Sequence, residues 1–364
     1  MIELIINRQC RNEENMGKIS KHTVIKIILL ISLLMLVIVF SASVGSADLS
    51  MADSFRIMLS RIPLLKRTVD VSDIKQVYFT IVFNIRLPRI CLAGLTGCGL
   101  AVSGAAYQGL FRNALADPHV LGVSSGAAVG ATFAILSGIN ISFLGLGAVG
   151  LCAFAGAMLT IIFVYSISIT SGRLPVVQLL LAGTAVSSLL SSIISLFMTF
   201  NKEGIEKVYM WTLGSFSAAN WTKVLYLLIF AAAVTLGIMY FSRELNMLML
   251  GEDTAESLGV NINKIERLLI VISSLLVAAC VSVSGIIGFV GLIIPHCMRM
   301  LCGVDYKRLI PFACFGGAIF MIICDTAART IAAPSEIPVG IITSILGAPY
   351  FIYLIKKNKK KISL

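Results

Sequence analysis

One polar stretch of this otherwise apolar chain gathers carboxylates: residues 243–267, RELNMLMLGEDTAESLGVNINKIER. Glu252, Asp253 and Glu256 lie there among small residues. Acidic side chains at this density suit contact with a basic partner, because opposite charges set the register of an interface. The same pattern also fits a solvated turn between two apolar segments. The rest of the chain has to decide between the two interpretations.

The local pattern predicts a short helix from Asp253 to Gly259. Asp253 can cap or charge its first turn, and Gly259 can end it, because glycine readily adopts the left-handed conformation found after a helix. If the stretch is a docking surface, its small and acidic residues are the candidate contacts. They are Gly251, Glu252, Asp253, Ala255, Glu256, Leu258 and Gly259.

Other chemistry-bearing patterns are sparse. The chain has no GxxxxGK[ST] phosphate-binding loop, so ATP-driven transport would need a separate ATPase. Asp325 and Arg329 are spaced i,i+4 in an apolar segment and can pair along one helix face. An ion-coupled carrier usually has more buried ionisable groups, so it stays the alternative function. No catalytic residue or metal site is predicted, since His296 has no partners in the sequence and the nine cysteines form no CxxC pair.

The composition identifies the class of protein. The chain has 364 residues, of which 58% are hydrophobic and 13% charged, whereas soluble domains average about 25% charged. It is therefore expected to be an all-α polytopic membrane protein. The net charge of +11 is attributed to basic cytoplasmic ends such as residues 356–361, and not to nucleic-acid binding.

Hydropathy predicts about ten spans, since each needs about 20 residues. A single transmembrane domain, residues 24–355, is expected between an N-terminal tail (1–23) and a basic tail (356–364). The eighth span is short and glycine-broken, and it needs protein neighbours. The predicted spans are approximately 24–44, 83–110, 121–136, 143–167, 176–200, 222–241, 268–283, 285–299, 311–331 and 339–355.

An even number of spans places both termini on one side of the membrane. The basic tail and the basic residues before the first span predict that this side is the cytoplasm, together with the 243–267 stretch. The loop 45–83 is also basic and opposes this assignment weakly.

Several motifs resemble the FecCD-type permease subunits of iron–siderophore, haem and vitamin B12 ABC importers. The resemblance covers residues 80–356, and each motif alone would be weak. Ala114 departs from it, because the family usually has proline there, and this should loosen one loop. The motifs are RLPR (86–89), SGAAYQ (103–108), RNALADP (112–118), LGVSSGA (121–127), LGE (250–252), LGV (258–260), GIIGFVGLIIPH (285–296), EIPVG (336–340) and LGAP (346–349).

The resemblance implies a type II importer permease fold with ten spans. It implies a second permease subunit, identical or paralogous, with the substrate path at the interface. Two ATPase subunits inside and one substrate-binding protein outside would complete the transporter. This chain would bind no cofactor, and ATP would be used by the partner. The expected substrate is an iron chelate, haem or cobalamin, and the sequence does not say which.

The resemblance also assigns roles to residues. Residues 243–267 match the cytoplasmic coupling loop that docks into the ATPase. Arg86, Arg89 and Arg329 match positions that meet acidic side chains of the binding protein, although snorkelling, or for Arg329 pairing with Asp325, would also explain them. Thr170 and Ser171 match a cytoplasmic gate in the turn before the fifth span. That turn is also explained by its glycine and proline alone.

Overall fold

The computed structural model describes residues 21–45, 50–61, 70–139, 141–143, 145–169 and 175–362. Within these ranges the chain is helical except for its connections and two short strands, β1 (Ser142–Phe143) and β2 (Leu146–Gly147). The strands pair antiparallel. The predicted all-α class is therefore confirmed.

Eight helical segments in the described ranges are long and apolar enough to cross a membrane. Two shorter apolar helices, α6 (Val123–Ser137) and α14 (Val290–Cys302), take the places of the predicted third and eighth spans. The prediction of about ten spans is thus confirmed. The eight long segments are α2 (Lys21–Ser43), the continuous helix from Gln76 to Leu110, α7 (Ala148–Ser168), α8 (Val176–Phe200), α10 (Trp221–Tyr240), α13 (Ile262–Ser284), α15 (Tyr306–Thr330) and α16 (Val339–Ile362).

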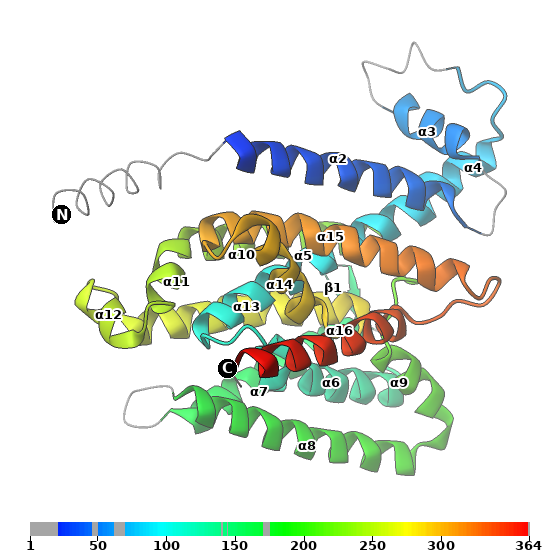
Figure 1. The fold of residues 1–364 in the computed structure, drawn as a ribbon. Coiled ribbons are helices and arrows are strands. Elements are labelled where there is room, and N and C mark those ends of the chain that lie inside the picture. The colour runs from blue at the N-terminus through cyan, green and yellow to red at the C-terminus, as the bar shows by residue number, and fades with distance from the viewer. Residues whose placement is uncertain are drawn as a thin grey trace.

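Shorter helices connect the spans. On the side where α2 ends lie α3 (Met51–Ser60) and α9 (Ile205–Thr212), while α11 (Ser242–Leu248) and α12 (Glu252–Ser257) lie at the opposite end of the bundle (Figure 1). Two single turns complete the set, η2 (Pro118–Leu121) and η3 (Lys202–Gly204).

The second span begins earlier than predicted. It runs as α4 (Gln76–Thr80), a π-helical segment η1 (Ile81–Arg86) and α5 (Leu87–Leu110). The added segment 76–82 is mostly apolar, but Asn84, Arg86 and Arg89 after it lower the hydropathy of this part of the helix.

The fourth and eighth spans begin later than predicted. A β-turn with Gly145 at φ +79° delays the fourth span until Ala148. Gly285, at φ +72°, ends α13, and helix resumes only at Val290. Both apolar segments contain glycines in conformations that interrupt a helix, which hydropathy does not register.

The seventh span begins earlier, at Ile262 and not near Leu268. The Asn261 side chain accepts a hydrogen bond from the backbone N–H of Lys264 and caps the helix. This is an ordinary use of asparagine at a helix start, and it adds the segment 262–267, which contains Glu266, to the span.

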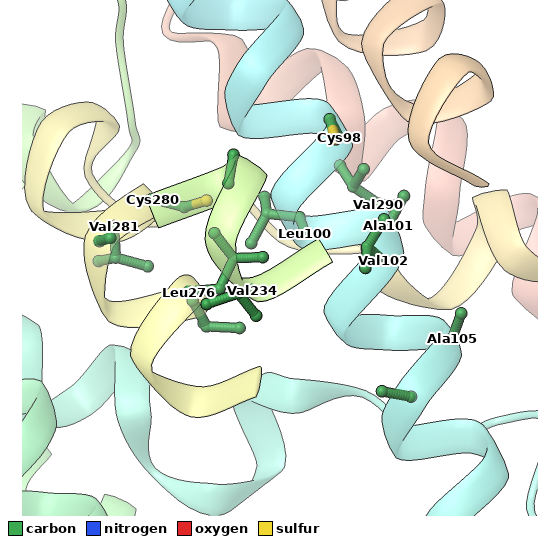
Figure 2. Close-up of a cluster of buried hydrophobic side chains, with 14 of the residues drawn as sticks. Cys98, Leu100, Ala101, Val102, Ala105, Val234, Leu276, Cys280, Val281 and Val290 are labelled. Carbon is green, nitrogen blue, oxygen red and sulfur yellow. The ribbon is translucent and has the colours of Figure 1, made fainter. Parts of the chain in front are cut away.

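Helix α5 is the centre of the molecule. Of its most apolar 18-residue stretch, 89% is buried inside the protein. Helices α10, α13, α14 and α15 pack around it. Figure 2 shows part of this core, where Leu100 of α5 lies toward Val234 of α10 and Leu276 of α13, while Ala101 and Val102 lie on the other side, near Val290 of α14.

Glycines let α5 approach its neighbours at backbone distance. A Cβ atom on Gly97 would lie 2.1 Å from the carbonyl oxygen of Gly317 in α15. A Cβ atom on Gly104 would lie 2.0 Å from that of Gly291 in α14. Lipid offers apolar groups an environment as favourable as a protein core, so close packing of this kind drives helix association in membranes.

The first span lies at the edge of the bundle. Helix α2 runs beside α15 (Figure 1), and only 11% of its most apolar stretch is buried. Its remaining surface is apolar, which suits lipid. After α2 comes the helix α3, whose Ile57 packs against Val82.

We predict that Gly104→Ala destabilises the protein strongly, because the added methyl group would overlap the backbone of α14. Overpacking in cores costs up to about 3 kcal/mol. Thermal unfolding in detergent should therefore show a clearly lower Tm. Gly147→Ala is the matched control, since its Cβ would meet nothing within 4 Å. Equal Tm values for the two variants would contradict the packing at α5.

Candidate coupling and docking sites

The acidic stretch forms two short helices at one end of the bundle. Helix α11 follows α10 directly, and α12 begins after Gly251, which has φ +108°. Gly251, and not Asp253, is the residue before the first turn of α12, and no side chain caps that turn. Glu252 and Asp253 lie within the first turn, where their charges interact favourably with the positive end of the helix dipole.

The end of α12 agrees with the prediction. Gly259 has φ +86°, and its N–H donates to the carbonyl of Glu256 at 2.9 Å. The N–H of Val260 donates to the carbonyl of Ala255 at 3.0 Å. These two bonds form the Schellman arrangement, in which a glycine in left-handed conformation ends a helix.

The two faces of α12 differ in chemistry. Ala255 is fully buried, so its small size seats α12 on this chain and does not leave it free to meet a partner. Glu252, Asp253 and Glu256 are exposed. The Leu258 side chain, 55% exposed, lies beside them. The acidic residues and Leu258 are therefore open to solvent, while Ala255 faces the bundle.

An ion pair that sequence reasoning missed ties α12 to the central helix. The Arg112 guanidinium contacts the Glu252 carboxylate. Arg112 has φ +47°, and the N–H groups of Arg112 and Asn113 donate to the carbonyls of Gly109 and Gln108. It thus occupies the helix-ending position that glycine usually takes. Strained backbone often marks a functional site.

At the opposite end of the bundle, Arg86 and Arg329 contact the end of α2, whereas Arg89 contacts other elements. Arg86 is 5% exposed and donates to the carbonyls of Ala42 and Ser43 at 2.6 and 3.1 Å. Arg329 donates to the carbonyl of Ser41 and, at 2.9 Å, to its hydroxyl. Both therefore hold the end of α2. The guanidinium groups of Arg86 and Arg89, only three residues apart, thus approach different helices.

Arg89 is the centre of a charged cluster. It binds Asp325 of α15 at 2.9 Å and Glu336, in the turn before α16, at 2.8 Å. Asp325 is 1% exposed, and its predicted intrahelical partner Arg329 is more distant, at 4.0 Å. The intrahelical pair is therefore present but secondary. A buried carboxylate needs such partners, because leaving it unpaired costs several kcal/mol, on the order of 3–5.

The predicted gate residues Thr170 and Ser171 lie outside the described residues. Their role stays a prediction.

A stripe of hydroxyl groups on α8 also escaped sequence reasoning. Only 17% of the most apolar stretch of α8 is buried, yet the helix exposes a series of serines and threonines. The i,i+4 spacing of these residues in the sequence could have predicted the stripe. Several of them donate to the backbone carbonyl three or four residues earlier. The exposed residues are Thr184, Ser188, Ser191, Ser192, Ser195 and Thr199.

Comparisons with known proteins fit this architecture. A cobalamin import system permease protein from Halobacterium salinarum is 41% identical over 279 residues, which cover 77% of this chain and 74% of the relative. A hemin transport system permease protein from Yersinia pestis is 37% identical over 336 residues, which cover 91% of this chain and 95% of the relative. A solved structure described as a metal-chelate type ABC transporter in an inward-facing conformation matches with a TM-score of 0.78 and 34% identity. The match covers 91% of this chain and 98% of that structure's chain.

The family model of the FecCD transport family matches residues 33–357, nearly the whole helical bundle. The chain therefore belongs to the FecCD transport family and is a permease of the ABC importer type.

Proposed function

We propose that this chain is the permease subunit of a binding-protein-dependent ABC importer that carries an iron chelate, haem or cobalamin across the cytoplasmic membrane. The observation that carries the proposal is the exposed acidic helix α12 at the end of a multi-span bundle. The relatives named above handle hemin and cobalamin. They support this substrate class without choosing a member of it.

The energy for transport would come from another polypeptide. The sequence contains no phosphate-binding loop of the GxxxxGK[ST] type, so we propose that the chain has no ATPase site and binds no cofactor. Two copies of an ATPase subunit would use ATP. Each copy would bind one permease subunit through α11 and α12. An external binding protein would deliver the substrate.

The substrate path would lie between two permease subunits. The hydroxyl stripe of α8 supports this, because a face that only met lipid would gain nothing from exposed hydroxyl groups. Hydroxyl groups lining a path offer a large polar chelate many weak contacts. The second subunit would be identical or paralogous.

The distribution of charge indicates which end of the bundle faces the cytoplasm. Helix α2 begins and α16 ends toward the end of the molecule where α12 lies (Figure 1). The basic residues of both chain ends favour the cytoplasm. We therefore propose that both termini and the coupling helices are cytoplasmic.

The ion pair between Arg112 and Glu252 suggests how coupling works. Glu252 belongs to the helix that the ATPase would grip, and Arg112 directly follows the central helix α5. A displacement of α12 would therefore break or re-form this contact at the end of α5.

At the outer end, we propose that Arg89 meets an acidic side chain of the binding protein. Its present partner Glu336 is 44% exposed, so an incoming carboxylate can replace it, while Asp325 keeps the guanidinium in place. For Arg86 and Arg329 the same role stays a prediction, and it needs their release from the backbone carbonyls at the end of α2.

We predict that the purified permease alone, in sealed liposomes, does not accumulate a chelate such as haem or cobalamin against its gradient. Adding its ATPase, its binding protein and ATP should produce accumulation. The measurement is uptake of labelled chelate with and without ATP. Accumulation by the permease alone, driven by a proton or sodium gradient, would instead establish the ion-coupled carrier.

We predict that the double variant Glu252→Lys/Glu256→Lys loses the ATPase, because two attractive contacts become repulsive. Copurification of the ATPase should fall at least about tenfold, and uptake with it. Glu203→Lys/Glu206→Lys, at the opposite end of the bundle, is the control of equal charge change. Unchanged copurification and uptake in the α12 variant would show that α12 is not the docking element.

We predict opposite effects for two outer-end variants. Arg89→Gln should weaken binding of the binding protein about tenfold, because it removes the attracting charge. Glu336→Gln should strengthen it by about twofold or more, because it releases the guanidinium. Arg56→Gln is the control, since its ion pairs with Asp53 and Asp73 lie within its own outer segment. Equal affinities for all three variants would contradict the role of Arg89.

A further inference from the structure

A pocket of about 270 Å³ lies between the coupling helix and the bundle. Its walls come from three elements, of which two are consecutive in the chain and the third is distant in sequence. They are α12, the first turns of α13 and the start of α8. The lining residues are Pro175, Val176, Glu252, Asp253, Glu256, Ile262, Asn263 and Glu266.

Glu266 distinguishes this pocket from an ordinary acidic surface. Its side chain lines the pocket, yet the residue is only 9% exposed. Among the described contacts it has neither a hydrogen bond nor an ion pair. Arg112, the cation whose charge acts on Glu266, is already bound to Glu252. A carboxylate removed from water without a partner is unfavourable, so Glu266 is suited to receive a positively charged group.

The charges around the pocket are unbalanced. Four carboxylates line it, those of Glu252, Asp253, Glu256 and Glu266, and Arg112 compensates one of them. A metal ion does not fit the geometry, because the described residues contain no group of three His, Cys, Asp or Glu side chains placed to share one.

A single basic side chain does fit. Val176 and Ile262 provide apolar wall for the methylene stem of an arginine or lysine, while Glu266 meets the charged head. The acidic surface of α12 would guide the approach, since complementary charge accelerates and orients association.

We infer that this pocket receives one arginine or lysine side chain of the ATPase subunit, which binds Glu266. The inference rests on the proposed function and extends it in one respect. Glu266 belongs to the membrane-crossing helix α13, and not to the coupling helix. The ATPase would therefore hold a transmembrane helix directly as well as α12.

The experiment measures binding of the purified ATPase subunit to the full-length permease in nanodiscs. Glu266→Gln keeps the shape of the side chain and removes its charge, and Glu266→Lys fills the pocket with a cation. Expected losses of affinity are about tenfold for the first variant and more for the second. Glu203→Gln is the control. Thermal unfolding of each variant in detergent shows that the fold is retained.

A charge exchange identifies the partner side chain. Each exposed arginine and lysine on the permease-facing surface of the ATPase is replaced by glutamate. One of these variants should bind the Glu266→Lys permease at least about tenfold better than the wild-type ATPase does. Wild-type affinity in both Glu266 variants, or rescue by none of the replacements, overturns the inference. If the wild-type proteins themselves do not bind, the proposed function fails instead.

A basic residue of this chain is the competing occupant. Arg173 precedes Pro175 by two residues and lies outside the described residues. In an Arg173→Gln background, Glu266→Gln should still weaken ATPase binding about tenfold. Loss of that effect would assign the pocket to Arg173 and overturn the inference.

Discussion

The structure depends on the close backbone approach of α5 to its neighbours. Gly97 and Gly104 bring α5 into contact with α15 and α14 at distances that no other residue would permit. Burial from water cannot hold helices together in a bilayer, so dispersion between closely packed backbones must do so. Helices α10 and α13 also pack against α5, whereas α6, α7 and α8 pack on one another and this group contacts α13.

The same helix connects the two ends of the molecule. Helix α5 has 24 residues, and at 1.5 Å per residue it extends about 36 Å. Near its start Arg89 binds Asp325 and Glu336, and directly after its end Arg112 binds Glu252. The element that is packed most tightly thus also carries a charged contact toward each proposed partner. A rigid, central helix suits a subunit whose motion is driven from outside.

The charged contacts differ in exposure, and this decides what each can do. Asp325 is almost fully buried, so its pairing with Arg89 fixes the relation of α5 to α15. Glu336 and Glu252 are exposed, so their ion pairs are screened by water and exchange at low cost. Glu266 is intermediate in character, being nearly buried and yet lining an open pocket. Permanent contacts lie inside the bundle, and replaceable ones lie at its two ends.

The sequence by itself determined the class of protein, the approximate number of spans and the short helix that Gly259 ends. Apolar runs long enough to cross a bilayer and the glycine that ends α12 are local signals, readable without any neighbour. Tertiary structure decided the partners of the charged residues. Arg86 and Arg89 are three residues apart, yet one binds the end of α2 and the other binds α15. Arg112 and Glu266 acquire their roles only because α12 folds back beside α5 and α13. Arg86 binds a carbonyl 44 positions away and Arg89 binds a carboxylate 236 positions away, and no local pattern encodes which distant group will lie within reach.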